Sequence, residues 1–292
     1  MADITMFANR LRKNIRHWGT WARRQGITCY RIYDRDLPEF PLAIDLYHER
    51  VHLQEYATQL DAEEATMQQW REGVLAAVAE VLQCSPAAIA TKQRQRQRGT
   101  AQYEKLDRAG ESFIVTEHEH RFEVNLHNYL DTGLFLDHRK TRRMVQERAG
   151  GTRFLNLFAY TGSFTVYAAA GGAVSSVTVD MSSTYQDWAR RNYLLNNLEL
   201  ADHELVRADV IRYLESARTA GLKFDLIVMD PPAFSNSKKM QGVLDIQRDH
   251  GALIDGAMAL LATDGELVFS ANRRGLRLNE HLHDRYLVHE IS

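Results

Sequence analysis

Hydrophobic positions divide the chain into two regions with different periodicities. Before about residue 127, helical spacing over 5–25 and 61–83 accompanies short alternating runs rich in Tyr, Ile and Val, which predict strands. These runs cover 28–33, 42–47, 51–57, 88–94, 112–117 and 120–125. Gly26 follows the first helix as a C-terminal glycine does. The sequence therefore predicts a small α+β domain over residues 1–127.

From about residue 138, short apolar runs alternate with helical segments, beginning with a helix over 139–149. The predicted strands are 153–158, 175–179, 203–207, 224–229, 265–270 and 286–291. Such alternation is typical of a parallel sheet with helices on both faces. Ligands bind such sheets at the carboxyl ends of the strands. We therefore expect an α/β domain over 128–292, with its site at those ends.

Small and acidic residues follow the first three predicted strands of this domain. The turn through Gly162 lets a ligand approach the N-terminus of the next helix. Asp180 is placed to accept hydrogen bonds from ribose hydroxyls. Asp209 can accept one from the exocyclic amino group of an adenine. Each aspartate could instead be a helix N-cap, so the pattern alone leaves both interpretations open.

The fourth strand ends in the most specific motif of the chain, Asp230-Pro231-Pro232-Ala233-Phe234. Two prolines fix the backbone and remove two donors, which leaves the preceding carbonyls available as acceptors. Phe234 offers a ring on which a flipped base can stack, worth roughly 1–3 kcal/mol. The alternative is a rigid turn with no ligand.

Composition restricts these possibilities. The 292 residues are 45% hydrophobic and carry a net charge of -2, so any nucleic-acid surface must be a local patch. The two cysteines, Cys29 and Cys84, form no CxxC pair or Cys/His cluster, so we expect no metal site. There is no signal peptide and no apolar run of the roughly 20 residues that span a bilayer. We therefore expect a soluble cytoplasmic protein that does not bind membranes.

Basic residues gather at three places. The first helix carries several and no acidic residue, a second group alternates with glutamine after residue 92, and a third follows the fourth and fifth strands of the second domain. The predicted RNA-binding residues are Arg10, Arg12, Lys13, Arg16, Arg94, Arg96, Arg98, Lys238, Lys239, Arg273 and Arg274. A solvated helix face and a charged sheet edge are the alternatives for the first two groups. Phosphate contacts would make affinity fall steeply with salt.

Long motifs at 6–14, 29–34, 129–139, 154–162 and 247–250 resemble a known family. The order of strand ends resembles that of class I S-adenosylmethionine-dependent methyltransferases, whose sheet is Rossmann-like. Over nearly its whole length the chain is similar to RlmK, the C-terminal half of the bacterial 23S rRNA methyltransferase RlmKL. This resemblance implies methyl transfer from S-adenosylmethionine to N7 of a guanine in 23S rRNA.

The resemblance also implies roles for individual residues. Phe158, Tyr160, Thr161 and Gly162 would line the methionine side of the cofactor, Asp180 would hold its ribose, and Met181, Asp209 and Val210 its adenine. Thr132 and Gly133 belong to a segment that would cover the cofactor, and Asp230, Pro231, Pro232 and Phe234 would face the base. The family's upstream methyltransferase and THUMP module are absent from this sequence, so a separate THUMP-bearing partner is a further expectation. If 286–291 is the sixth strand, the sheet lacks its seventh.

The chemistry of the acceptor separates the remaining alternatives. Guanine N7 has a free lone pair and needs no general base; His250 is the candidate if one were used. Methylation of cytosine C5 needs a nucleophilic cysteine, and none follows the fourth or fifth strand. Two alternatives stay open: methylation of an exocyclic amino group (N2 of guanine or N6 of adenine) in RNA or DNA, and a non-catalytic RNA-binding module.

Overall fold

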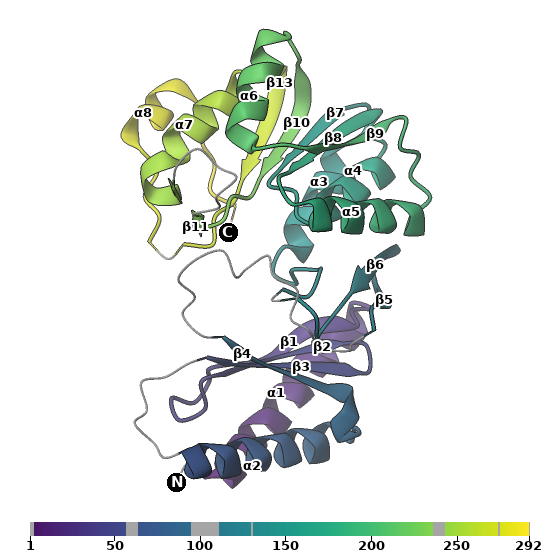
Figure 1. The fold of residues 1–292 in the computed structure, drawn as a ribbon, viewed down its shortest axis with the longest axis vertical. Coiled ribbons are helices and arrows are strands. Elements are labelled where there is room, and N and C mark those ends of the chain that lie inside the picture. Colours follow the sequence, from purple (N-terminus) through teal and green to yellow (C-terminus); the bar gives the residue numbers. More distant parts are fainter. Residues whose placement is uncertain are drawn as a thin grey trace. The chain divides into compact units, whose positions relative to one another are not determined.

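The structure is a computed structural model that describes residues 3–56, 64–94, 111–129, 131–235, 243–273 and 275–291. The chain forms two compact units, Met1–Asp137 and His138–Ser292 (Figure 1). The division lies ten residues beyond the predicted boundary at 127, since 137 − 127 = 10. Residues 128–137 thus belong to the first unit.

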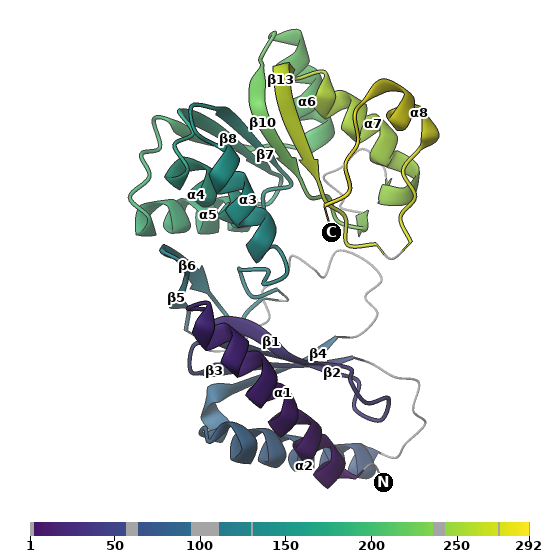
Figure 2. The same ribbon diagram turned by 180° about the vertical axis from the view of Figure 1, so that it is seen from behind.

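The first unit is an α+β fold around a four-stranded sheet (Figure 2). Its elements are α1 (Ile4–Arg24), β1 (Cys29–Asp34), β2 (Leu42–Tyr47), β3 (Arg50–Tyr56), α2 (Glu64–Leu82), a 3-10 turn (Pro86–Ala88), β4 (Ile89–Arg94), β5 (Phe113–Glu117) and β6 (His120–Val124). The sheet order is β1-β2-β3-β4, with β3 and β4 parallel, and β5 and β6 form the predicted hairpin.

Helices α1 and α2 of this unit bury their apolar sides against the sheet, with Phe7 and Leu11 of α1 completely buried. The Asp3 side chain caps α1 by accepting a hydrogen bond from the Thr5 amide, at 2.8 Å. The predicted glycine ends the helix in the left-handed conformation, with φ of 65° at Gly26. The predicted start of the second helix at Asp61 lies outside the described residues.

The second unit has a five-stranded parallel sheet of order β13-β10-β7-β8-β9. Its elements are α3 (Arg139–Arg148), β7 (Arg153–Leu157), α4 (Ser163–Ala170), β8 (Ser175–Asp180), α5 (Ser183–Leu195), β9 (His203–Arg207), α6 (Val210–Thr219), β10 (Phe224–Met229), β11 (Phe234–Ser235), β12 (Leu244–Asp245), α7 (Ile246–Met258), β13 (Leu261–Phe269) and α8 (Glu280–Arg285). Five of the six predicted strands are present at or near their expected positions.

Both faces of this parallel sheet are covered, which is why its strands are apolar on both sides. Helices α3 and α4 pack on the face that includes Phe154 and Val228. Helices α6 and α7 pack on the opposite face, with Leu155 and Ile227. The predicted Rossmann-like α/β fold is confirmed.

The predicted sixth strand over 286–291 is wrong. These residues form no strand, and the side chains of Leu287 and Ile291 are 87% and 60% exposed. A segment with alternating apolar residues becomes a buried strand only where it can pair with the edge of a sheet. Here Tyr286 is held instead by its hydroxyl, which donates to Asp255 on α7 at 2.9 Å. In the part of the chain that the structure describes, the sheet therefore ends at β13.

Candidate functional site

The loops that follow β7, β8, β9 and β10 meet at one edge of the second unit, because these strands are parallel and adjacent. The loop after β7 has an unusual backbone. Phe158 and Tyr160 have φ of 56° and 51°, and Gly162 has 72°. A side chain at position 162 would also lie 2.9 Å from the Tyr193 ring. A positive φ costs free energy at Phe158 and Tyr160, because neither residue is glycine. Such backbone strain concentrates at ligand sites.

Three hydrogen bonds hold this loop in place. The Tyr160 amide donates to Oδ2 of Asp180 at 2.9 Å, and the Ala159 amide donates to the Val179 carbonyl at 3.1 Å. The side chain of Asn192 on α5 donates to the Thr161 carbonyl at 2.9 Å. Thr161 itself is completely buried, and its place beside the methionine part of a cofactor stays a prediction. It supports the loop from within.

Asp180 combines burial with several backbone donors. Besides the Tyr160 amide, its Oδ1 accepts a hydrogen bond from the Ser182 amide at 2.8 Å. Burial raises the pKa of this carboxyl to about 6, against the opposing effect of the backbone hydrogen bonds. Ser182, not Asp180, caps α5. The Met181 amide contributes a third backbone hydrogen bond, so the carboxylate keeps only part of its acceptor capacity for a ligand hydroxyl.

Asp209 caps a helix, as the sequence allowed, and its contact with adenine stays a prediction. It is the N-cap of α6, and its Oδ1 accepts a hydrogen bond from the Arg212 amide at 3.1 Å. Val210, predicted to bind the cofactor, is only 4% exposed and packs in the core between the sheet and α6 and α7. Met181 is partly exposed after β8, and its carbonyl accepts from Arg207 at 3.4 Å. The predicted adenine contacts thus fall on residues with different degrees of access.

The motif after β10 presents one aromatic ring to solvent. Pro231 is buried, whereas Phe234 is 56% exposed. Phe234 lies on β11, which pairs with β12 so that Phe234 is opposite Asp245. The Ile246 amide also donates to the Ala233 carbonyl at 3.2 Å. These pairings hold the ring outward on a short strand. The hydrophobic effect alone would favour a buried ring.

A histidine that the sequence analysis did not identify contacts the motif. Nε2 of His138 lies 3.2 Å from Oδ2 of Asp230, and the two side chains are 17% and 25% exposed. The His138 ring also meets Phe164 of α4 edge-on, with centroids 5.5 Å apart. The only signal was its place in the 129–139 motif, immediately before α3. Asp230 is thus oriented by a neighbour that could hold it in place.

His250, considered as a general base, is a structural residue. It is completely buried, and its Nε2 accepts a hydrogen bond from the Asn279 amide at 3.0 Å. Its Nδ1 lies 2.9 Å from the Ile246 carbonyl, to which it must donate. With both nitrogens engaged and no access to solvent, His250 is not placed to act on a substrate.

The predicted RNA-binding cations differ in their contacts in the structure. Arg12 forms an ion pair of 2.6 Å with Glu80 of α2, whereas Arg10, Lys13 and Arg16 lie elsewhere on α1. Arg273 forms an ion pair of 3.3 Å with Asp245, opposite Phe234 on β12. Only the backbone of Arg94 is described, and Arg96, Arg98, Lys238, Lys239 and Arg274 lie outside the described residues.

The predicted cofactor-covering residues Thr132 and Gly133 lie in the first unit. The Thr132 hydroxyl is buried and lies 2.8 Å from the Tyr47 hydroxyl, which also donates to the Leu134 carbonyl at 3.1 Å. These contacts fix the segment onto the sheet of that unit. Nearby, the Lys92 ammonium is buried and donates to the Tyr129 carbonyl, so the first cation of the Arg/Gln series faces inward.

Metal-binding clusters and membrane-spanning helices are both absent from the described residues. Among them, no three His, Cys, Asp or Glu side chains gather in a way that could hold a metal ion. None of the helices described here has the length and apolar character that crossing a membrane requires.

Comparison with known sequences places this geometry in context. Residues 61–278 match the profile of a family described as S-adenosylmethionine-dependent methyltransferase. A ribosomal RNA large subunit methyltransferase K from Neisseria meningitidis is 58% identical over 292 residues, which are all of this chain and 82% of that protein. A ribosomal RNA large subunit methyltransferase K/L from Marinobacter nauticus is 51% identical over 98% of this chain, but the chain spans only 40% of that protein.

Solved structures give the same result. A methyltransferase crystallised with SAH has a TM-score of 0.78 and 27% identity, covering 94% of this chain and 69% of that one. An S-adenosylmethionine-dependent methyltransferase from Streptococcus mutans has a TM-score of 0.76 and 26% identity, covering 93% and 68%. Both agree with the family and the cofactor that the sequence predicts.

Proposed function

We propose, from the premise that this chain belongs to the S-adenosylmethionine-dependent methyltransferase family, that it methylates N7 of a guanine in 23S rRNA. The names of the K and K/L relatives support large-subunit ribosomal RNA as the substrate. The choice of guanine N7 rests on the resemblance and on the chemistry of the residues around Asp230. A separate THUMP-bearing partner remains a prediction.

The residues after β7 and β8 fit the cofactor. Asp180 is held by backbone amides, and its remaining acceptor capacity would take a ribose hydroxyl. The turn through Gly162, against which Tyr193 and Ala189 of α5 pack closely, leads into the N-terminus of α4, where backbone amides could approach the cofactor. Phe158 and Tyr160 are partly exposed beside it. When bound, S-adenosylmethionine supplies a methyl group activated by its positively charged sulfur.

Guanine N7 attacks with a lone pair that lies in the plane of the ring. The N–C bond forms while the C–S bond breaks, and the bonding pair stays on sulfur. The positive charge therefore moves from sulfur to the guanine ring, and no proton has to leave. The protein needs to orient the ring, exclude water and stabilise the charge that develops on it.

The observation that carries this proposal is the arrangement of Asp230, His138 and Phe234. The Asp230 carboxylate, beside the partly buried His138, supplies negative charge where the base becomes positive. Phe234 offers an exposed ring for stacking on the same short motif. His250, the residue considered as a base, is buried with both nitrogens engaged, which agrees with an acceptor that needs none.

The alternative is transfer to an exocyclic amino group. Asp230 is partly exposed, and its carboxylate could accept a hydrogen bond from such an amine. That reaction differs because the amino nitrogen must lose a proton after the methyl group arrives.

Nucleoside analysis of rRNA treated with the protein and labelled S-adenosylmethionine distinguishes the two reactions. We expect label in 7-methylguanosine. Label in N2-methylguanosine or N6-methyladenosine, with none in 7-methylguanosine, would exclude the N7 proposal and favour the alternative.

A further inference from the structure

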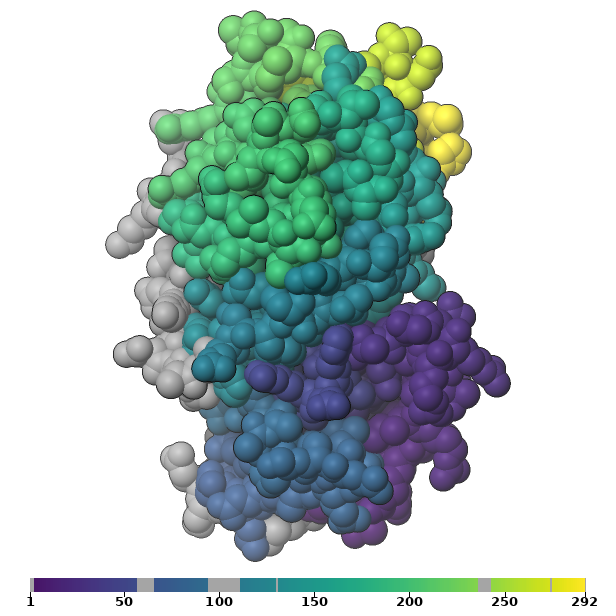
Figure 3. Space-filling view, turned by 90° about the vertical axis from the view of Figure 1, so that its right-hand side faces the viewer, coloured from purple at the N-terminus to yellow at the C-terminus, as the bar shows by residue number. Residues whose placement is uncertain are grey.

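Helix α1 of the first unit has a buried side and a polar side that faces outward. Its buried side includes Phe7 and Leu11, and its sequence has no acidic residue. With 3.6 residues per turn, residues spaced by three or four share a face. The residues Arg10, Lys13, Arg16, His17, Thr20, Trp21 and Arg24 follow this spacing. We call them the outward face of α1; the helix lies at the surface in Figure 3, coloured purple.

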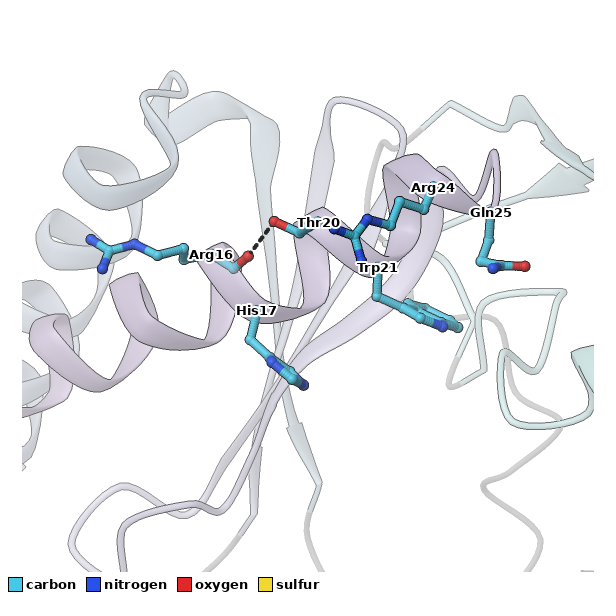
Figure 4. A pocket seen from close by; sticks show the side chains of 6 residues that line it. All are labelled: Arg16, His17, Thr20, Trp21, Arg24 and Gln25. Carbon is cyan, nitrogen blue, oxygen red and sulfur yellow. Dashed lines mark hydrogen bonds between the residues drawn. The ribbon is translucent and has the colours of Figure 1, made fainter.

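The outward face holds an open pocket of about 410 Å³ near the C-terminal end of α1. Its lining residues are Arg16, His17, Thr20, Trp21, Arg24 and Gln25. Figure 4 shows the rings of His17 and Trp21 extending from the same side of the helix. The Thr20 hydroxyl is turned back to the Arg16 carbonyl at 2.7 Å, so it does not fill the pocket.

Aromatic side chains next to the pocket remain accessible to solvent. Trp18 is 42% exposed, and its ring meets those of His17 and Trp21 edge-on, with centroids 4.8 and 6.0 Å apart. Trp21 is partly buried and His17 is exposed. The three rings support one another without entering the core. Exposed aromatic clusters of this kind are typical of binding surfaces.

The cations beside these rings differ from their neighbours in their contacts. Arg12 pairs with Glu80, and Arg23 donates to the Thr20 hydroxyl at 3.3 Å. Within the described ranges, Arg16 and Arg24 take part in no ion pair. Both are exposed and both line the pocket. Their charges are therefore available to an anionic ligand.

We propose that this pocket binds an unpaired nucleotide of RNA, with the base against His17 and Trp21 and the flanking phosphates at Arg16 and Arg24. The inference rests on the proposed RNA substrate and adds a contact outside the methyl-transfer site. A planar ring joined to a phosphate matches aromatic and guanidinium groups on one face. A duplex would present only phosphates to this pocket, because its bases are stacked and paired.

Fluorescence anisotropy with a short labelled single-stranded oligoribonucleotide tests the proposal in the full chain. Trp21→Ala should weaken binding by about 5- to 150-fold, the range expected for one stacked base. Trp21→Phe should restore most of the affinity because it retains a ring. His17→Ala, at an exposed position, should weaken binding in the same direction and does not depend on how Trp21 packs.

Two neighbouring arginines provide the matched control. Arg24→Gln should lower the dependence of log affinity on log salt by about 0.7, the value for one phosphate of a single strand. Arg23→Gln removes the same charge about 100° around the helix and should change neither affinity nor salt dependence comparably.

Equal effects of Arg23→Gln and Arg24→Gln would overturn the proposal, since they would indicate attraction by net charge alone. Unchanged affinity in both Trp21→Ala and His17→Ala would also overturn it, as would a duplex that binds as tightly as the single strand and is insensitive to Trp21. These results are independent of the methylated position. A protein that forms 7-methylguanosine while its pocket variants bind RNA normally would refute this inference and leave the proposed function intact.

Discussion

The carboxyl edge of the second unit's sheet and the outward face of α1 use side chains in opposite ways. At the sheet edge, the residues proposed to bind the cofactor also hold the backbone. Asp180 ties down both Tyr160 and Ser182, and Gly162 allows the close approach of α5. On α1, the side chains of Arg16, His17 and Arg24 extend into solvent. Substitutions at the first site should affect fold and binding together, whereas those on the second should affect RNA binding alone.

The largest effect expected at the sheet edge is that of Gly162→Ala. The new methyl group would meet the Tyr193 ring at 2.9 Å, and that ring is held by a hydrogen bond of 2.6 Å between its hydroxyl and Thr178. We expect the free energy of unfolding to fall by about 2–4 kcal/mol, from strain and overpacking together. Denaturant unfolding measures it.

Gly151→Ala is the matched control, because Gly151 has a similar φ of 74° but no atom within 4 Å of the added carbon. It should cost only the strain, about 1–2 kcal/mol. Equal costs at the two positions would mean that packing around Gly162 is looser than described.

Asp180→Ala should come next. It removes the acceptor proposed for the ribose hydroxyls, and hydrogen bonds to a charged group contribute about 1.5–3 kcal/mol. Calorimetry with S-adenosylmethionine should show affinity reduced roughly 10- to 100-fold, together with lower stability, since two amides lose their partner. Unchanged affinity would remove Asp180 from the proposed site, and an absence of binding in the unaltered protein would favour the non-catalytic RNA-binding alternative.

Phe234→Ala should lower turnover on RNA without lowering cofactor affinity. The ring is exposed and supports little of the fold, so stability should be nearly unchanged. Loss of stacking should raise the activation free energy of methyl transfer to rRNA by about 1–3 kcal/mol, so turnover should fall. Steady-state kinetics with rRNA, beside calorimetry with the cofactor, checks this. If cofactor affinity is lost and RNA turnover spared, the base does not lie at Phe234.

Cofactor affinity should depend on pH through Asp180, whose pKa is raised to about 6. The ionised form is the acceptor, so affinity should be constant above pH 6 and fall up to about tenfold per unit below it. The opposite sign applies to stability. The fold holds the proton more tightly than the unfolded chain, so this group's contribution to the unfolding free energy decreases as pH rises from about 4 to 6. Asp180→Asn should bind more weakly without this pH dependence; a similar decline in that variant would assign the titration to another group.

The smallest effect is expected for His138→Gln. Gln can still donate to Asp230 but lacks the imidazole ring, and both side chains are partly exposed. The activation free energy should rise by about 0.5–1.5 kcal/mol, so turnover should fall, with little change in cofactor affinity. A change confined to cofactor affinity would show that His138 does not position Asp230 for the transfer step.

The sequence was informative where local pattern determines structure. Parallel strands place Asp180, Asp209 and Asp230 at one edge, and periodicity alone predicted that. It did not distinguish their roles, because capping depends on where each helix starts: Asp209 caps α6 whereas Ser182 caps α5. The contact of His138 with Asp230 joins positions far apart in the chain, so no local pattern could indicate it.

Three features that the local pattern could not indicate have the same origin. The cations of α1 were predicted as one group, but Arg12 pairs with Glu80 on another helix. Packing buries Thr161 completely, whereas Phe158 and Tyr160 of the same loop are partly exposed. The apolar residues after Tyr286 have strand periodicity but no sheet edge to cover them. Burial and pairing across the fold decided each case.

The identity of the methylated atom is best tested in the cell. 23S rRNA from a strain lacking this gene should lose a 7-methylguanosine, and expression of the unaltered chain should restore it while Asp180→Ala should not. Unchanged 7-methylguanosine with loss of N2-methylguanosine or N6-methyladenosine would contradict transfer to guanine N7.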